Sequence, residues 1–243
     1  MIELLVLGTL TGFTSGFFGV GGGMILVPLL IVSGFEMKAA IAISIMQMVF
    51  SSIFGSFLNI KKSSAVFKDG FFIGIGGMLG GLFSGYIVSS FSNTFLQYLF
   101  IIIVIFSILR IFFSPAEPIK EERKQNKFIL ILIGFFIGLI AMSIGVGGSI
   151  MLTPILVGFM HYSLKRATAL GLFFVVFSSI AGFSSLWFHG QILLTEGATV
   201  GIASLIGVYF GIKVKTLIHS NSYKKYILLL NISVLFMMIY KTI

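Results

Sequence analysis

Long apolar stretches dominate this chain and limit what it can fold into. Of its residues, 58% are hydrophobic and 9% are charged, whereas soluble domains carry roughly 25% charged residues. A stretch of about 20 apolar residues can cross a bilayer as a helix, which satisfies its own backbone hydrogen bonds there. Besides one at the N-terminus, such stretches begin near residues 38, 70, 94, 128, 167, 197 and 223. The sequence therefore predicts an all-α polytopic membrane protein.

The chain also repeats itself at a nearly constant offset. GVGGG at 19–23 recurs as GVGGS at 145–149, and a proline follows each copy after a short apolar run. Farther along, FSSI at 50–53 recurs at 177–180. Repeats of this kind in a membrane protein are typical of folds in which two similar halves enclose a site near the middle of the bilayer.

We therefore divide the chain into two halves with a common plan. The N-terminal repeat covers residues 1–113 and the C-terminal repeat covers residues 128–243. Between them, residues 114–127 hold two of the four prolines and a dense run of charges, which is typical of a solvated linker.

The glycine clusters allow two membrane topologies. If each cluster only kinks a continuous span, the two halves are parallel and the 16 Lys and Arg divide 9 to 7 between the two sides. If each cluster is instead the tip of a re-entrant hairpin, each half has three full spans, the second half is inverted, and the division becomes 14 to 2. Because positively charged loops favour the cytoplasm, the second division is the expected one.

We therefore predict two inverted-topology repeats, each a glycine-tipped hairpin plus three transmembrane helices. The linker would be cytoplasmic and both termini would lie outside the cytoplasm, in a bacterial-type inner membrane. Residues 24–34 would rise about 16 Å as a helix, roughly half of a ~30 Å hydrocarbon core. Residues 2–18 are nearly long enough to span, so a continuous broken helix, with eight helical spans in all, stays the alternative. Glu3 argues against a cleaved signal peptide.

Charge and cysteine content narrow the function classes. The net charge of +9 comes from basic residues in short loops, where membrane orientation accounts for them without a nucleic-acid partner. The absence of cysteine excludes disulfides and thiol chemistry. No predicted span carries a buried carboxylate or a nucleophile with a base, so we expect no enzyme, no metal and no cofactor. Coupling to protons would then use the protonation of the substrate itself.

The two glycine clusters are candidate binding elements. Unpaired backbone at membrane depth is tolerated only inside the protein or beside a watery cavity. Helices starting at Met24 and Ile150 would aim free N–H groups and positive dipole ends at the tips, which together form an anion site without a basic side chain. The candidate residues are Gly19, Gly21, Gly22, Gly23, Met24, Gly145, Gly147, Gly148, Ser149 and Ile150.

Close helix packing is the alternative for any of these glycines. Consecutive glycines destabilise a helix, so for the two clusters we favour a site. For two other sets at helical spacing we favour packing. These sets are Gly8, Gly12 and Gly16, and Gly70, Gly74, Gly77, Gly81 and Gly85.

A stripe of small and polar residues follows each hairpin. It contains Gln47 and Ser51 in the first half and Ser178, the repeat mate of Ser51, in the second. These side chains could donate hydrogen bonds to an oxyanion or could only bond between helices, and both readings stay open, although for Ser44 we favour the interhelical bond. Phe174 stands where the first half has Gln47, an asymmetry that suits a substrate without two-fold symmetry.

These motifs resemble the TauE/SafE family of sulfite and organosulfonate exporters, also called the 4-toluene sulfonate uptake permease family. The likeness rests on the duplicated glycine–proline motif at 16–28 and 145–154, on the Ser-Ser-Ile-x-Gly elements and on the HGQI turn, and it covers essentially the whole chain. It implies a secondary transporter that exports small sulfur-containing anions, such as sulfite, sulfoacetate or other organosulfonates, by alternating access and without an ATPase subunit. Ser149 in place of the last glycine, like Phe174 opposite Gln47, bears on substrate choice.

Other functions stay compatible with the residues. A passive anion channel would use the same dipole site, an uptake permease would move a related oxyanion inward, and a structural membrane protein would use the glycines for folding alone. The expected partners are a small anionic substrate and the lipid bilayer, with no nucleic acid. The sequence leaves open the exact substrate, the direction of transport, the coupling ion and the oligomeric state.

Overall fold

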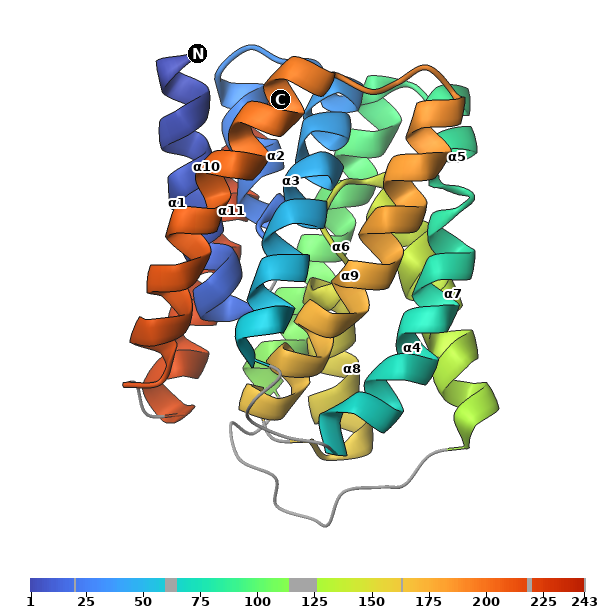
Figure 1. Cartoon of the computed structure of the whole chain (residues 1–243), viewed down its shortest axis with the longest axis vertical. Coiled ribbons are helices and arrows are strands. Elements are labelled where there is room, and N and C mark those ends of the chain that lie inside the picture. Colours follow the sequence, from blue (N-terminus) through green and yellow to red (C-terminus); the bar gives the residue numbers. More distant parts are fainter. Residues whose placement is uncertain (20, 60–64, 114–125, 163, 218–219, 243) are drawn as a thin grey trace.

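Helices account for all the regular structure in the described part of the chain. The computed structural model describes residues 1–19, 21–59, 65–113, 126–162, 164–217 and 220–242. Within these ranges no strand occurs, which confirms the predicted all-α class (Figure 1). The helices are α1 (Ile2–Phe18), α2 (Gly23–Val32), α3 (Met37–Asn59), α4 (Ala65–Gly81), α5 (Ser84–Ser90), α6 (Asn93–Phe113), α7 (Lys127–Ser143), α8 (Ser149–Met160), α9 (Leu164–Phe188), α10 (Leu194–Lys215) and α11 (Ser220–Thr242).

Six segments among the described residues are long and apolar enough to cross a membrane. They are Met37–Leu58, Gly70–Ser90, Asn93–Phe113, Arg166–Phe188, Leu194–Lys215 and Lys224–Thr242. The remaining apolar helices, α1, α2, α7 and α8, are shorter, at 10 to 17 residues. The number of full spans agrees with the prediction, and the four short helices lie where the hairpin arms were expected.

The first two helices form a hairpin around the first glycine cluster. Ser33, the residue after α2, donates a 2.5 Å hydrogen bond from its Oγ to Oε1 of Glu3 in the first turn of α1. The end of α2 therefore lies beside the start of α1, at the upper end of Figure 1. With 10 residues α2 is about 15 Å long, half of a bilayer core. The alternative of one continuous broken span does not apply to this segment.

The second hairpin, α7 and α8, enters from the opposite end of the bundle. In Figure 1, α7 starts and α8 ends at the lower end, whereas both chain termini lie at the upper end. At the lower end the guanidinium of Arg110, in the last turn of α6, lies 4.3 Å from the ring centre of Phe159 near the end of α8. The two tips therefore approach each other from opposite directions.

The two central helices, α3 and α9, pack against the return arms of the hairpins. The most apolar windows of α3 and α9 are each 61% buried, against 33% for α6 and 22% for α11. α3 packs on α9, while α2 packs on α3 and α8 packs on α9. At the flank α6 contacts α8 and α11, and α11 contacts α2. Each packing in one half thus has a counterpart in the other.

The closest helix contacts join the two halves. α1 packs on α10 and α7 packs on α4, in each case with the helices parallel and glycine at the contact. A methyl group on Gly12 would collide with the carbonyl of Ser204, and one on Gly138 would collide with the carbonyl of Gly77. Because helices in a membrane gain little from the hydrophobic effect, close backbone contact supplies much of their attraction. The packing role predicted for the α1 set is confirmed, and it holds equally for Gly8 and Gly16.

The second predicted packing set lies on α4 and α5 and faces α9. Methyl groups on Gly70 and Gly74 would press on the rings of Phe173 and Phe177. Farther along the same face, Gly77, Gly81 and Gly85 lie against Phe174, Ser178 and Ser185. These glycines let two spans approach closely, as predicted.

A break between α4 and α5 was not predicted. It falls at Leu82 and Phe83, and Ser185 of α9 bridges it. The Ser185 Oγ accepts a 2.9 Å hydrogen bond from the N–H of Gly85 and donates a 2.5 Å bond to the carbonyl of Leu82. The corresponding helix of the second half, α10, is continuous over its 22 residues. The middle spans of the two halves therefore differ.

Candidate functional site

The first glycine tip joins α1 to α2 through left-handed backbone. Gly19 ends α1 with φ of +69° and donates its N–H to the carbonyl of Ser15 at 2.8 Å. Gly21 and Gly22 follow with φ of +79° and +83°. Residues with a side chain rarely adopt such values, so the chain reverses direction here only because these residues are glycine.

The second tip has the same backbone pattern. Gly145, Gly147 and Gly148 have φ of +70°, +87° and +68°. The carbonyl of Gly148 accepts the N–H of Met151 at 3.1 Å and that of Leu152 at 2.9 Å, which starts the hydrogen-bond pattern of α8. The repeated sequence motif therefore corresponds to a repeated backbone conformation.

Both return arms start at a tip, and the first N–H of α8, that of Ser149, donates to the carbonyl of Gly147 at 2.7 Å. α2 begins at Gly23 and α8 at Ser149, each one residue before the predicted starts at Met24 and Ile150. The first intrahelical bond of α2 comes from the N–H of Ile25, at 3.2 Å, so the two earlier N–H groups have no acceptor within the helix. The positive end of each helix dipole lies at the same place.

The two tips meet inside the bundle, where each lies against the central helix of the other half. A methyl group on Gly23 would collide with the carbonyl of Gly145, and that carbonyl accepts a 2.7 Å hydrogen bond from the Oγ of Ser44 in α3. On the other side, a methyl on Gly171 of α9 would lie 3.5 Å from the carbonyl of Gly19. All the candidate residues of both tips are buried. Backbone from the two halves therefore lines one interior region.

Gln47 of α3 faces the first tip. Its side chain is 0% exposed, and a methyl group on Gly22 would lie 2.7 Å from its Nε2 and 2.8 Å from its Oε1. Neither amide atom has a hydrogen-bond partner among the described residues. Burying an amide without a partner costs roughly 1–3 kcal/mol, so a side chain of this kind calls for an explanation such as a bound ligand.

Phe174 of α9 takes the corresponding place at the second tip. A methyl group on Gly148 would collide with its ring, which is also fully buried and packs against Gly77 of α4. The amide of Gln47 and the ring of Phe174 thus flank equivalent glycines. The interior region between the tips has one polar wall and one apolar wall.

The three serines of the predicted stripe differ in what they contact. The Oγ of Ser51 donates to the carbonyl of Gly21 at 3.2 Å, so this side chain lies at the first tip. The Oγ of Ser178 donates to the carbonyl of Phe174 at 3.1 Å, within its own helix. The Oγ of Ser44 donates to the carbonyl of Gly145 at 2.7 Å, so this side chain lies at the second tip and does not make the helix-to-helix bond that we favoured for it. The structure therefore brings Ser51 to a tip but does not give Ser178 the matching contact.

Two further hydroxyl groups beside the tips were missed by sequence reasoning. Ser15 lies one helical turn before Gly19, and Thr153 lies one turn after Ser149. The hydroxyl oxygens of Ser15, Ser149 and Thr153 are buried and have no hydrogen-bond partner in the described part of the chain. The four-residue spacing from each tip was the available signal, since it places these side chains on the face that points the same way.

The arrangement offers hydrogen-bond donors without a nearby negative charge. The carboxylates of Glu3 and Glu196 lie in the first turns of α1 and α10, and Glu36 precedes α3, so none of the three is at a tip. Among the residues that the structure describes, no group of three or more His, Asp or Glu could hold a metal ion. Backbone N–H groups at helix starts, an amide and hydroxyls are the donors that stabilise a bound anion.

Comparison with known proteins gives a consistent picture. The family model described as "Sulfite exporter TauE/SafE" matches residues 4–238. The chain is 23% identical over 255 residues to the "Probable membrane transporter protein YunE" of Bacillus subtilis (strain 168), covering 94% of this chain and 92% of that protein.

Two further relatives carry similar descriptions. A "Probable membrane transporter protein" of Methanocaldococcus jannaschii is 29% identical over 189 residues, which cover 75% of this chain and 70% of the relative. Another, of Haemophilus influenzae, is 23% identical over 217 residues, covering 87% of this chain and 85% of the relative. The matches extend over both halves of the chain.

Proposed function

Because the chain belongs to the sulfite exporter TauE/SafE family of membrane transporters, we propose that it is a secondary transporter that exports small sulfur-containing anions. Sulfite, sulfoacetate and other organosulfonates are the substrates that we put forward. The anion would be held between the two glycine tips, on the N–H groups that start α2 and α8, from Gly21 to Met24 and from Gly147 to Ile150. Of these, the Ser149 N–H would first have to leave the carbonyl of Gly147, to which it donates at 2.7 Å. A helix start binds an anion without a charged side chain.

The observation that carries the proposal is the buried, unpartnered amide of Gln47. It lies against Gly22, where the start of α2 presents its own donors. An anion at this place would accept from the amide and from the helix start together. Ser51 contacts the same tip, whereas Ser178 would contribute only after its hydroxyl leaves the carbonyl of Phe174.

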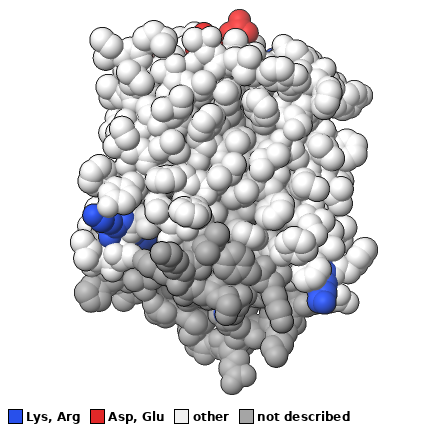
Figure 2. Space-filling model, viewed as in Figure 1, with Lys and Arg blue, Asp and Glu red and all other residues white. Residues whose placement is uncertain are grey.

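The topology that we propose has both termini outside the cytoplasm and the linker at 114–127 inside, in a bacterial-type inner membrane. Lys and Arg lie toward the lower end of Figure 2 and Asp and Glu at its upper end. Positive charge favours the cytoplasmic side, which makes the lower end cytoplasmic. The matching packings of the two halves support inverted repeats at 1–113 and 128–243, the boundaries that the sequence suggested.

This topology is tested by single cysteines, since the chain has none of its own. Lys241→Cys near the end of α11 should react with a membrane-impermeant thiol reagent added to intact cells. Lys127→Cys at the start of α7 should react only after the membrane is opened. Both side chains are exposed, so the reverse pattern would contradict the proposed orientation.

For the mechanism we propose alternating access, in which movement of the hairpins opens the site to one side at a time. The two tips reach the interior from opposite ends, so displacement of either one would expose the site to its own end of the bundle. Flux of the anion against its gradient, lost when the proton gradient collapses, would distinguish this mechanism from a passive channel.

The substrate class is tested by thermal unfolding of the purified protein with sulfite, sulfoacetate, taurine or thiosulfate. A ligand at about 100 times its Kd adds roughly 2.7 kcal/mol to the free energy of unfolding, an easily measured shift. Gln47→Ala should abolish the shift, and Gln97→Ala, in the outer helix α6, should retain it. No shift with any of these anions would refute the substrate class but not the fold.

A further inference from the structure

The surroundings of the first tip are polar at positions where those of the second are apolar. Alignment of the two halves pairs Thr168 with Ile41 and Lys215 with Val88. Thr168 is 1% exposed and Ile41 and Val88 are both 0% exposed, so these are interior positions. The two halves therefore differ chemically at these positions, although the backbone of their tips is alike.

Lys215 and Thr168 are in direct contact beside the first tip. The Lys215 Nζ donates a 3.0 Å hydrogen bond to Thr168 Oγ1. The carbonyl of Thr168 lies so close to Gly19 that a methyl group there would collide with it. One residue, Thr168, therefore separates the ammonium from the glycine tip, and the hydrogen bond between Lys215 and Thr168 is partly buried.

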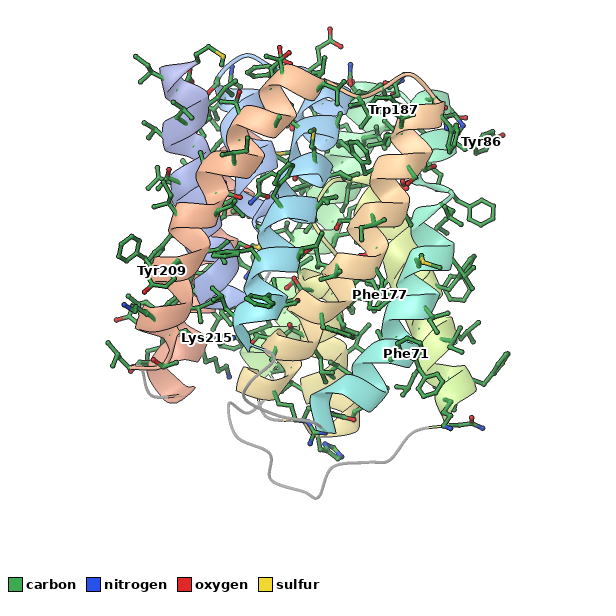
Figure 3. The ribbon with its side chains drawn as sticks, in the orientation of Figure 1. Phe71, Tyr86, Phe177, Trp187, Tyr209 and Lys215 are labelled. Carbon is green, nitrogen blue, oxygen red and sulfur yellow. The ribbon has the colours of Figure 1, made fainter. Side chains whose placement is uncertain are left out.

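The position of Lys215 on α10 explains how it reaches this place. It is the last residue of α10, one turn beyond Gly211, which packs so tightly on α1 that a methyl would collide with the carbonyl of Phe13. α1 ends at Phe18, so Lys215 lies just past the end of α1, where the tip begins. Figure 3 shows Lys215 extending from the lower part of α10 toward the bundle, whereas Tyr209 points outward.

The hydroxyl of Ser15 lies on the other side of Gly19 and adds a further polar group beside the first tip. Ser15 is 0% exposed, its Oγ has no hydrogen-bond partner among the described residues, and its carbonyl accepts the N–H of Gly19. The equivalent residue at the second tip is Ala141. A cation, two hydroxyls and the Gln47 amide thus lie around the first tip. The second tip also has hydroxyls, from Ser44, Ser149 and Thr153, but Phe174 and Val88 stand there in place of the amide and the cation.

We propose that Lys215 and Thr168 form an outer anion subsite at the lower mouth of the transporter, which binds the substrate anion before it moves to the glycine tip. The inference rests on the proposed function and adds a charged residue to a site otherwise built from neutral donors. The half-buried ammonium attracts an anion from solution, and its hydrogen bond to Thr168 holds it at the entrance. At the upper end the repeat mates Ile41 and Val88 are apolar, and the half-buried Lys38 bonds there to the carbonyl of Ser89 at 3.3 Å rather than to a hydroxyl at a tip.

Lys215 could instead serve only the fold, because a cation past the end of α1 also stabilises the negative end of that helix dipole. The two roles differ in what they change. A structural role alters the melting temperature and the transport rate from both sides, whereas a subsite alters the apparent affinity from one side. The test therefore measures affinity at each face separately.

The experiment uses the full-length protein in proteoliposomes of known orientation, with labelled sulfite or sulfoacetate added at one face. Lys215→Gln should raise the KM at the lower face about tenfold, which corresponds to the loss of about 1.4 kcal/mol of binding, and should change the KM at the upper face little. Lys215→Arg should restore most of the affinity. Lys213→Gln is the matched control, since Lys213 is exposed and lies 4.7 Å from the ring centre of Tyr209.

Thr168→Val removes the hydroxyl but keeps Lys215 and the shape of the side chain. It tests the same subsite if the Lys215 variant folds poorly. It should raise the KM at the lower face severalfold. Higher salt should raise the wild-type KM at that face and should have little effect on Lys215→Gln. If the variants keep the wild-type KM, or if their KM changes equally at both faces, the subsite is wrong. Transport of the anion by the wild type would still support the proposed function. Absence of both binding and flux in the wild type would overturn the proposed function itself, and the subsite with it.

Discussion

Replacing Gln47 with leucine should make the protein more stable and at the same time inactive. The amide is fully buried and neither of its polar atoms has a partner among the described residues. Leucine has nearly the same volume, so the variant removes the cost of an unpaired amide without leaving a large cavity. That cost is roughly 1–3 kcal/mol, and its removal should raise the free energy of unfolding by about 2 kcal/mol.

The assay is thermal unfolding of purified protein with and without substrate anion. For a chain of this length, about 2 kcal/mol corresponds to a rise of about 4–8 °C in Tm. Substrate should raise the Tm of the wild type and leave that of Gln47→Leu unchanged. Gln97→Leu, on the half-buried face of α6, is the control for exchanging an amide for an apolar side chain, and it should keep the shift.

Two results would refute this reasoning. If Gln47→Leu has a lower Tm than the wild type, the amide makes stabilising hydrogen bonds in the protein without ligand and is not left unpaired for a ligand. If the variant is more stable but still responds to the anion, the amide is not part of the binding site. A gain in stability joined to a loss of binding is the pattern expected of a residue kept for function.

Three further substitutions test the fold by the same melting assay. His161→Gly should raise stability by about 1 kcal/mol, because His161 has φ of +59° and its repeat mate is a glycine, and an unchanged Tm would show that this backbone carries no strain. Gly12→Ala should cost about 1–3 kcal/mol or more, since its methyl would collide with the Ser204 carbonyl, and a neutral result would mean that α1 and α10 separate easily. Ser185→Ala should cost roughly 1–3 kcal/mol by leaving two backbone groups at the α4–α5 break unpaired. Ser184→Ala should change the Tm little, because the half-buried Ser184 bonds only within its own helix, to the carbonyl of Ile180.

Much of the architecture could be predicted because membrane folding follows few rules. Apolar length gave eight stretches, and charge counting, which favoured hairpins over continuous helices, reduced the full spans to six. The bond from Ser33 to Glu3 is what establishes the first hairpin in the structure. Helix starts were displaced by one residue because an N-terminal glycine in the left-handed conformation leaves the next residue free to begin the helix, a detail that composition does not show.

The break at Leu82 and Phe83 escaped prediction for a different reason. No proline occurs there, and the local sequence is compatible with continuous helix. What makes the break tolerable is Ser185, which comes from another helix and satisfies the freed backbone groups. Local sequence carries no sign of a partner about a hundred residues away.

The candidate site was only partly visible in the sequence. Comparing the halves singled out Gln47 against Phe174, and the structure places both at equivalent glycines. The same comparison gave Ser178 as the mate of Ser51, yet the two hydroxyls bond to different elements. Lys215 counted in the sequence only as a charge that sets orientation, because its approach to the tip depends on how α10 packs on α1.

The tight contacts of α1 with α10 and of α7 with α4 bear on how the protein can move. Any rocking of the N-terminal half against the C-terminal half would pull apart both parallel contacts, where the backbones are too close to admit a side chain. The mechanical units of this chain are therefore composite bodies, each made of an entering arm from one half and a middle span from the other. The rigid units of the protein therefore do not coincide with its two sequence repeats. Distance probes placed on α10 and α4 should detect motion between them, whereas probes on α10 and α1 should detect little.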